Sequence, residues 1–460
     1  MSINFSAFEI GRRALNANQL GMSIAGQNIA NVNTPGYSRR VLQLSESSAV
    51  NISGYTVGNG VTVAGIQSFR DNFIQARIQT ETGIAGRLTA QRNALAPVES
   101  ALQGSENGGL QSAIAGFFGA FRDLEANPGS LPLRSLTAQR GANLANAFQS
   151  TRARIEAIRT STDGQLRSSV EQVNSLSERV ASLNKQIRLA EATGPEASAL
   201  RDQRDQLVTK LSELSGARAA ENQDGTLTIT IGEGRPLVAG DRSFSLSATQ
   251  TPPVGLTTIS LDGEPAVFTE GTIAGFQNAI AITTLQISDL DALAASVAER
   301  VNTLHASGTD MDGNAGVSFF DSSQPVTAAN ISVNAAVAGD PRLIVASPLS
   351  QPGQAGTVAG EIANLLTDTS SSAGTRTGSF SSIFSSMVAE SGEHIRSADN
   401  DLETQAAILS QAVAQRESVS GVSLDEEAIN LLQYQKAFEA AARFMKVADE
   451  MTQMILSLAG

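Results

Sequence analysis

Apolar side chains near the C-terminal end recur at alternating steps of three and four residues, between positions 423 and 458. The side chains in this row are Leu424, Leu431, Tyr434, Phe438, Ala441, Met445, Ala448 and Ile455, and the polar residues Glu427 and Thr452 interrupt it. This spacing is typical of a coiled-coil seam, in which one face of a helix packs against a second helix. Ser423, with Glu426 three residues later, predicts a capping box at the helix start.

A second row of apolar residues near the N-terminal end offers a partner for this seam. Phe8, Leu15, Met22 and Ile29 recur every seven residues, and Ile10, Ala17 and Ile24 lie beside them. We predict a helix over residues 3–32 that pairs with the C-terminal helix, so that the rest of the chain is a long excursion between two paired ends. The alternative is an ordinary amphipathic helix on a globular core.

Glycines make this first helix weak on its own. Gly11, Gly21 and Gly26 lie within it, and each glycine costs a helix up to ~1 kcal/mol relative to alanine. We therefore expect the segment to be disordered alone in water and to become helical when its seam is buried.

Turn and strand signals follow the first helix. Pro35 fixes φ and Gly36 allows a positive φ, which predicts a type II turn over residues 34–37. Alternating residues predict strands at 39–44 and 55–66, the second with a hairpin turn at Asn59-Gly60. A helix is then expected to resume through Phe69, Phe73, Ala76 and Ile78 and to run into Leu88.

Helical periodicity dominates residues 110–215. The apolar positions Leu110, Ile114, Phe117, Phe121 and Leu124 predict a buried amphipathic helix that ends at Asn127-Pro128-Gly129. A much longer helix is predicted from about residue 136 to Gly194-Pro195, and leucines at 200, 207, 211 and 214 continue on a returning helix. Together they form a rod-like αα-hairpin.

The pattern changes to alternation after Gly216. Leu227, Ile229 and Ile231 alternate with threonines, and further short strands are predicted at 243–246 and 256–261. We expect a small β-rich domain at the far point of the excursion. Helix is predicted again over residues 273–304, followed by a Ser, Thr and Gly-rich linker with one short helix at 353–378, and by a helix over 380–415.

The predicted fold is mainly α with a smaller β-rich outer domain, built from paired N- and C-terminal coiled-coil helices and long helical rod-like hairpins. The expected segments follow in chain order. They are an N-terminal assembly helix (1–35), the N-terminal part of an inner rod domain (36–90), a long helical domain (91–215) and the β-rich outer domain (216–270). A returning helical and loop region (271–375), the C-terminal part of the inner rod domain (376–422) and a C-terminal assembly helix (423–460) complete the chain.

Composition and charge exclude several classes of function. The formal net charge is -13, which disfavours nucleic acid and anionic membranes, because both require clustered Lys and Arg. The chain has no cysteine, so disulfides, zinc–thiolate sites and cysteine nucleophiles are excluded. No run approaches eighteen apolar residues, and the N-terminal segment lacks the pattern of a secretory signal peptide. Work outside the cell would require an export route that reads an uncleaved terminus.

The sequence contains little evidence of a catalytic site. The two histidines, His305 and His394, have no ligand pattern nearby, and no nucleophile elbow, Walker loop or dinucleotide fingerprint is present. Residues 310–321 imitate the oxygen spacing of a calcium loop, but Ala315 stands where that loop needs glycine. We expect a solvated turn there, with calcium as the alternative. No catalytic, cofactor-binding or metal residue is predicted.

Motifs at both ends resemble the flagellar rod, hook and hook-associated protein families. Residues 25–39 read AGQNIANVNTPGYSR and residues 420–438 read SGVSLDEEAINLLQYQKAF, and both stretches are similar to the signatures of these axial proteins. Residues 58–63 and the stretch 301–320, which contains Asp310-Met-Asp312-Gly-Asn314 and a final Phe pair, favour the hook-associated protein 1 family among them.

The resemblance implies an extracellular structural protein of the bacterial flagellum, exported through the flagellar type III apparatus and located at the hook-filament junction. Its implied partners are further copies in a ring-like layer, the hook protein, the second junction protein and a cytoplasmic export chaperone. The alternatives are another axial protein, such as the hook protein or the second junction protein, a cell-wall enzyme carried by the flagellum, and a nucleic-acid-binding coiled coil.

The expected assembly interface combines the two seams with the N-terminal motif. Its residues are Phe8, Leu15, Met22, Asn28, Ile29, Asn31, Asn33, Pro35, Gly36, Tyr37, Leu431, Tyr434, Phe438, Ala441, Met445, Ala448 and Ile455.

Overall fold

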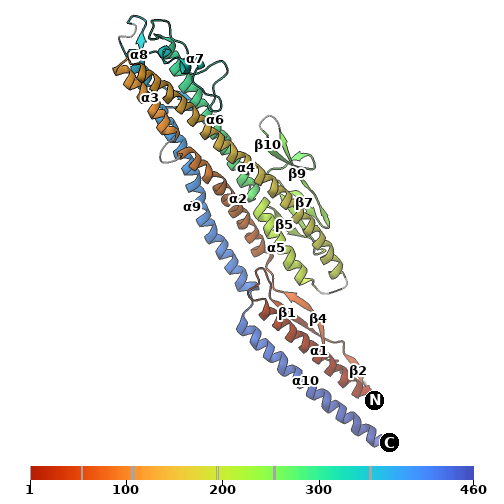
Figure 1. The fold of residues 1–460 in the computed structure, drawn as a ribbon. Coiled ribbons are helices and arrows are strands. Elements are labelled where there is room, and N and C mark those ends of the chain that lie inside the picture. Colours follow the sequence, from red (N-terminus) through yellow and green to blue (C-terminus); the bar gives the residue numbers. More distant parts are fainter. Residues whose placement is uncertain are drawn as a thin grey trace.

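The computed structural model is an elongated body in which the N- and C-terminal ends lie side by side at one end (Figure 1). It describes residues 2–52, 55–104, 109–192, 194, 196–251, 255–351 and 355–459. Pro195 and residues 353 and 354 of the predicted linker therefore lie outside the described residues. The fold is mainly α with a smaller strand-containing part, as predicted.

The terminal end of the molecule is built from two antiparallel helices and a β-ribbon. Helix α1 (Ser2–Ala30) packs along α10 (Leu424–Ala459). Strand β1 (Arg40–Glu46) pairs with β4 (Val61–Ser68), and β2 (Val50–Ile52) pairs with β3 (Tyr55–Val57). We call α1, α10 and this ribbon the terminal unit.

The predicted hairpin turn at Asn59-Gly60 is wrong. These residues lie within one arm of the ribbon, between β3 and β4, because β3 pairs with β2 and not with β4. Gly60 has a positive φ of 79°, and its carbonyl accepts a hydrogen bond from the Ser47 N–H at 2.9 Å, where the arm is irregular. A positive φ therefore marks a break in a strand here, and not a reversal of the chain.

The terminal unit continues into a long helical body. Its helices are α2 (Asn72–Gln103), α3 (Leu110–Ala126), α4 (Leu131–Glu191), α5 (Ser198–Ser215), α6 (Gly271–Ala306) and α9 (Phe380–Ser420). Side chains cap the starts of α2 and α4: Asp71 accepts hydrogen bonds from the N–H groups of Phe73 and Ile74, and Ser130 accepts one from Leu133. The predicted α4–α5 hairpin is confirmed.

Helix α2 begins later than predicted. Phe69, expected within the helix, lies before its first residue, Asn72; Phe69 and Phe73 are 48% and 78% exposed, whereas Ile74 and Ile78 are buried. The Asp71 cap sets the helix start, so the buried row begins one residue after Phe73. The helix also continues past Leu88 and through Pro97 to Gln103.

The β-rich part packs on the flank of the long helix α4. One sheet has the order β5 (Arg218–Glu221), β6 (Leu227–Ile231), β7 (Arg235–Ala239), β8 (Arg242–Ser243), and a second has β11 (Glu264–Pro265), β10 (Leu256–Leu261), β9 (Leu246–Thr251). Its predicted place at the far point of the excursion is wrong, because the sheets lie beside α4 and α5 at mid-length (Figure 1).

The end far from the termini is formed by α3 and the short elements after α6. These are β12 (Gly308–Thr309), α7 (Ala335–Gly339), η1 (Pro341–Leu343), β13 (Ser347–Pro348), α8 (Thr357–Asn364), β14 (Ser372–Ala373) and β15 (Arg376–Thr377). Phe117, Phe121, Phe319 and Phe320 pack their rings here at centroid distances of 5.0 to 5.6 Å.

Helix α6 joins the two large cores of the body. Ile273, Phe276 and Ile280 pack in the core beneath the sheets, and Leu290, Val297 and Val301 pack in the distal core. By length and composition alone, α6 is the one helix among the described residues that could cross a membrane. Its position between two cores accounts for its apolar composition.

Candidate assembly interface

Two glycines of α1 allow α10 to approach closely. A Cβ atom built on Gly21 would lie 2.6 Å from Cδ1 of the Tyr434 ring, and one on Gly11 would overlap Met445. Tyr434 and Met445 of α10 therefore pack against positions of α1 that carry no side chain. The glycines that weaken α1 as an isolated helix are what its contact with α10 requires.

The structure brings the predicted seam of α10 onto α1. Ala441 and Ala448 are buried, and Leu431, Tyr434, Phe438 and Met445 are half-buried, whereas Ile455 is 53% exposed. The seam is thus closed between Glu427 and Ala448, while Leu424, the first residue of the predicted row, is 50% exposed before it.

On α1 the two predicted rows have different neighbours. Phe8, Leu15, Met22 and Ile29 are half-buried at the side of the α10 contact, while Ala17 and Ile24 of the neighbouring row are fully buried. That second row faces the ribbon, since a Cβ built on Gly60 would lie 3.3 Å from Ile10. Helix α1 is therefore held between α10 and the ribbon.

A buried polar cluster closes the body-side end of the seam around Asn28. The Asn28 amide donates to Glu427 Oε2 at 3.0 Å and to the Arg40 carbonyl at 2.8 Å. Its oxygen accepts from the Tyr37 hydroxyl at 2.7 Å and from the Arg40 N–H at 3.1 Å. All four hydrogen-bonding positions of this fully buried amide are used.

Glu427, which interrupts the apolar seam, is the partner that Asn28 requires. It is 2% exposed, and its Oε1 accepts from Arg39 Nε at 2.8 Å. Ser423 Oγ accepts from the Glu426 N–H at 3.5 Å, but the Glu426 side chain, expected to complete a capping box, binds Arg39 at 2.9 Å. A buried charged pair of this kind fixes the register of the two helices, because a slip would leave it unpaired.

The predicted turn after α1 is confirmed. Tyr37 N–H donates to the Thr34 carbonyl at 3.2 Å, and Gly36 has φ of 79°. Asn31 is half-buried and donates to the Gln27 carbonyl at 2.9 Å, while Asn33 and Pro35 are exposed. The turn reaches α5 through Gln206, whose amide donates to the Pro35 carbonyl at 2.9 Å.

Asp202 of α5 ties the terminal unit to the body. Its carboxylate binds Arg40 of β1 at 3.0 Å and Arg70 at 2.5 Å. Arg39 N–H also donates to the Ser420 carbonyl at the end of α9, at 3.0 Å. We call this meeting point of the terminal unit and the body the joint. Sequence reasoning missed Asp202, Arg40 and Arg70, because a lone Asp in a charged helix carries no motif that marks a distant partner.

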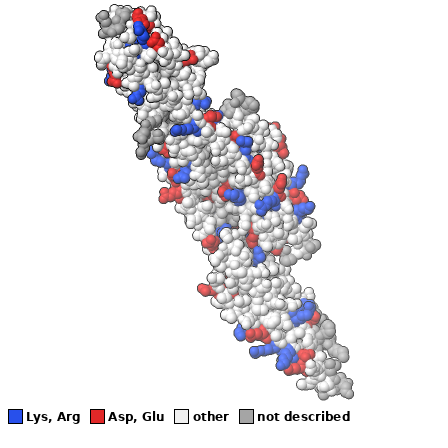
Figure 2. All heavy atoms as spheres, in the orientation of Figure 1, with Lys and Arg blue, Asp and Glu red and all other residues white. Residues whose placement is uncertain are grey.

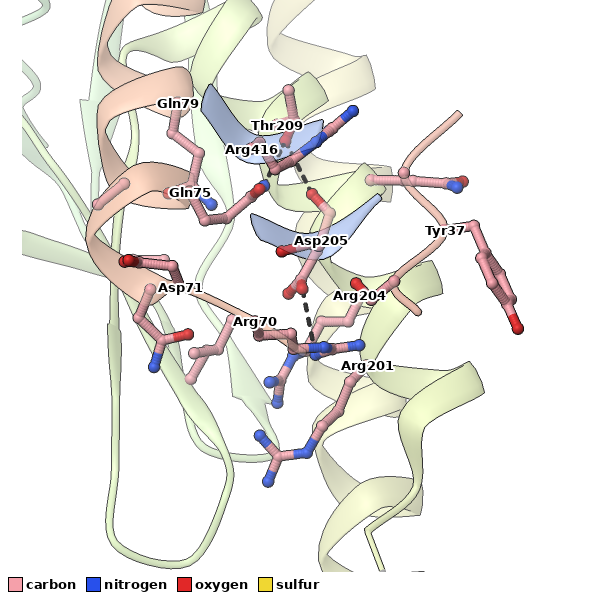
Figure 3. A pocket seen from close by; sticks show the side chains of 18 of the residues that line it. Tyr37, Arg70, Asp71, Gln75, Gln79, Arg201, Arg204, Asp205, Thr209 and Arg416 are labelled. Atoms are coloured by element: carbon pink, nitrogen blue, oxygen red, sulfur yellow. Dashed lines mark hydrogen bonds and ion pairs between the residues drawn. The ribbon is translucent and has the colours of Figure 1, made fainter. Parts of the chain in front are cut away.

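A cavity of about 610 Å³ opens at the joint (Figure 3). It is bounded by the turn at 34–38, the first turns of α2, part of α5, strand β5 and the end of α9. Tyr37 points away from it, toward Asn28. Burial raises the pKa of this tyrosine, so its hydroxyl remains a hydrogen-bond donor at neutral pH.

The histidines are used inside the fold or lie on its surface. His305 is fully buried; its Nδ1–H donates to the Val317 carbonyl, and its Nε2 accepts from the Val345 N–H at 2.9 Å. Burial lowers the pKa of His305 to about 4. The side chain of His394 is 39% exposed beside Glu390.

The loop that imitates a calcium site holds itself together. The Asp310 carboxylate accepts from the N–H groups of Asp312 and Asn314 at 2.9 and 2.8 Å and from the Asn314 amide at 3.1 Å. Asp312 binds Arg342. These internal bonds favour the turn over the calcium alternative, and the described residues contain no group of three or more potential metal ligands.

Three family models match the chain. The one described as "Flagellar hook-associated protein FlgK helical domain" matches residues 95–320. "Flagella basal body rod protein" matches residues 8–37, and "Flagellar basal body rod FlgEFG protein C-terminal" matches residues 414–458. The two rod models fall on the paired terminal helices, and the first falls on the helical body.

Curated relatives match over the whole length. Flagellar hook-associated protein 1 of Bacillus subtilis (strain 168) is 28% identical over 99% of both chains. The Salmonella typhimurium protein of the same name is 24% identical over 96% of this chain and 98% of its own. A solved structure, the flagellar hook junction protein FlgK from Burkholderia pseudomallei, superposes with a TM-score of 0.65 at 17% identity and covers 76% of this chain and 100% of its own.

Proposed function

We propose that the chain is a structural protein of the bacterial flagellum in the flagellar hook-associated protein 1 family, and that it assembles at the hook-filament junction through a second apolar row on α10. This outer row consists of Ile429 and Leu432 near the start of α10 and of Val447, Met451 and Met454 near its end, which are 52% to 64% exposed. The exposure of this row is the observation that carries the proposed mechanism.

The outer row lies opposite the seam that contacts α1. Met454 follows Met445 by nine residues, and nine residues turn a helix by about 180°. The inner side of α10 is therefore already filled by α1 of the same chain, while the outer row has no partner among the described residues. An uncovered apolar row along a helix is an unfavourable surface in water, and it favours association.

A second copy of the chain is the occupant that we propose for the outer row. Each added copy presents the same row along a helix at the end of an elongated molecule, so one contact repeated between copies would build a ring-like layer. The N-terminal seam residues Phe8, Leu15, Met22 and Ile29, which remain half-buried, would complete the surface between neighbouring pairs of helices.

Export and the axial partners belong to the same proposal. The terminal segments wait unfolded in the free chain, pass through the flagellar type III apparatus without cleavage, and pair on assembly. A cytoplasmic export chaperone covers the outer row beforehand, since its exposure invites aggregation. In the assembled junction the layer meets the hook protein on one side and the second junction protein on the other. We propose no enzymatic role.

The test places a charge in the outer row. Met451→Glu should reduce the fraction of hooks that carry filaments by at least about tenfold, because a buried carboxylate without a partner is costly. The matched control, Gln435→Glu, adds the same charge at an exposed polar position of α10. Electron microscopy counts the filaments, and the amount of variant in the culture medium reports export. Normal filaments on Met451→Glu hooks would exclude the outer row as the assembly surface.

A further inference from the structure

Four arginines line the cavity at the joint in a chain that is acidic overall. Its charged lining consists of Arg70, Arg201, Arg204 and Arg416 together with Asp71, Asp205 and Glu221. The whole chain has a formal charge of -13. Figure 3 shows Arg70, Arg201 and Arg204 close together along α5, with Arg416 reaching in from α9.

Two of these arginines are paired with carboxylates inside the chain. Arg70 binds Asp202 and Asp205, and Arg201 binds Glu191 at 2.8 Å as well as Glu221. Carboxylates of the same chain therefore compensate the charges of Arg70 and Arg201.

Arg204 is buried without a carboxylate. It is 2% exposed, and its Nη1 donates to Asn184 Oδ1 at 3.0 Å and to the Gly225 carbonyl at 2.7 Å. Its Nε has no hydrogen-bond partner, and it forms no ion pair with a described residue. Burial lowers the pKa of Arg204 to about 10, so the group remains cationic at neutral pH. The charges of Asp205 and Glu221 act on Arg204, but neither carboxylate forms an ion pair with it, so an anion placed in the cavity would add a favourable interaction.

Arg416 supplies a second uncompensated charge at the cavity wall. It is half-buried on the last turns of α9, and its guanidinium makes no hydrogen bond or ion pair with the described part of the chain. It enters from the side of the cavity opposite to Arg70 and Arg201 (Figure 3). An anion in the cavity would thus meet the unpaired guanidinium of Arg416 from α9 and the unbonded Nε of Arg204 from α5.

We infer that this cavity receives an acidic side chain of a second copy of the chain, and that Asp425 is that side chain. The inference rests on the proposed function, because it places identical copies side by side. Asp425 is exposed in the first turn of α10 and makes no hydrogen bond or ion pair with a described residue. It comes four residues after Gly421, which caps the end of α9 beside the joint, so both halves of the contact lie at the same level of the molecule.

The rest of the first turn of α10 also fits the cavity. Asp425 precedes Ile429 by one helical turn and therefore lies at the body-side end of the outer row. Leu424, next to it, is 50% exposed, and the cavity lining includes the apolar residues Ala76, Ala219 and Leu227. A volume of about 610 Å³ holds such a helical turn, not only one carboxylate. The contact continues the proposed assembly surface from α10 to the body.

Charge reversal tests the pair directly. Arg416→Glu and Asp425→Arg should each lower filament attachment about tenfold, since each places like charges together at the contact. The double variant restores the opposite charges in reverse order and should return attachment to within about twofold of the natural chain. Arg154→Glu, a charge reversal at an exposed arginine of α4 without a described partner, is the control. Thermal unfolding of each purified variant shows that the body remains folded.

Each outcome decides one point. Arg416→Glu with normal attachment overturns the cavity as a contact site. Two defective single variants whose combination stays defective overturn the assignment of Asp425. Failure of the natural chain itself to join hook and filament would instead contradict the proposed function, so the two failures are distinguishable.

Discussion

Single polar side chains at the joint each hold several elements. Asn28 connects α1 to β1, to the turn at Tyr37 and to α10 through Glu427. The N-terminal signature was expected to lie at the assembly interface, and its central amide is buried inside one chain. We propose that these residues shape the terminal unit, while exposed residues make the contacts with neighbouring copies.

His305 gives the body a defined dependence on pH. Its pKa is lowered to about 4 in the folded chain, against about 6.5 in an unfolded chain. The unfolded chain therefore binds more protons between these values, and the stabilisation present above pH 6.5 is lost as the pH falls toward 4. The full loss amounts to about 3 kcal/mol in the free energy of unfolding.

Denaturant unfolding at pH 7 and at pH 4.5 measures this effect. The natural chain should lose more stability on acidification than His305→Gln, whose side chain does not titrate. His394→Gln removes a histidine whose side chain is 39% exposed and should behave like the natural chain. Equal losses for the natural chain and His305→Gln would show that His305 does not carry the pH dependence.

At the scale of elements, local periodicity predicted the helices better than the strands. The rows in α3, α5, α6 and α10 each mark the buried face of a helix, whichever elements that face packs against. The ribbon was mispredicted because the choice of β4 as the partner of β1 depends on contacts far apart in sequence. The start of α2 was predicted too early because the apolar Phe69 resembles a helix position, whereas the Asp71 cap sets the start at Asn72.

Alanine substitutions at Gly21 and Gly26 distinguish the effect of helix propensity from the effect of packing against α10. Alanine favours a helix over glycine by up to ~1 kcal/mol, but at Gly21 its Cβ would meet the Tyr434 ring at 2.6 Å, whereas nothing lies within 4 Å of Gly26. Overpacking costs about 1–3 kcal/mol, so Gly21→Ala should weaken the pairing of α1 with α10. Gly26→Ala should strengthen it slightly.

Filament attachment at limiting expression measures both glycine variants. Gly21→Ala should lower attachment several-fold, and Gly26→Ala should leave it equal or higher. If both variants behave alike, the close approach of α10 to α1 at Tyr434 is not required for assembly.

At the scale of the molecule, the pairing of the two ends was predictable and the arrangement between them was not. Both terminal seams are visible as repeats, and each needs a partner of matching length. The place of the sheets depends on α4, whose 61 residues carry the chain along the body before it returns through α5. No local pattern encodes that geometry, and none predicted the joint, where Asp202 meets Arg40 and Arg70.

The surface of the whole molecule also fits assembly better than nucleic-acid binding. On the face shown in Figure 2, basic side chains lie among acidic ones along the length of the body. A nucleic-acid-binding surface requires basic side chains gathered on one face. The chain instead offers an apolar row on α10 and an arginine-lined cavity at the joint, and both suit contacts with further copies.

Hydrogen exchange of the free chain and of junctions isolated with their hooks tests the central claim, that the paired ends form the assembly element. We expect fast exchange over residues 2–35 and 424–459 in the free chain, strong protection of α4 and α6 in both states, and protection of both ends after assembly. Ends that exchange equally in the two states, whether fast or slow, would contradict it.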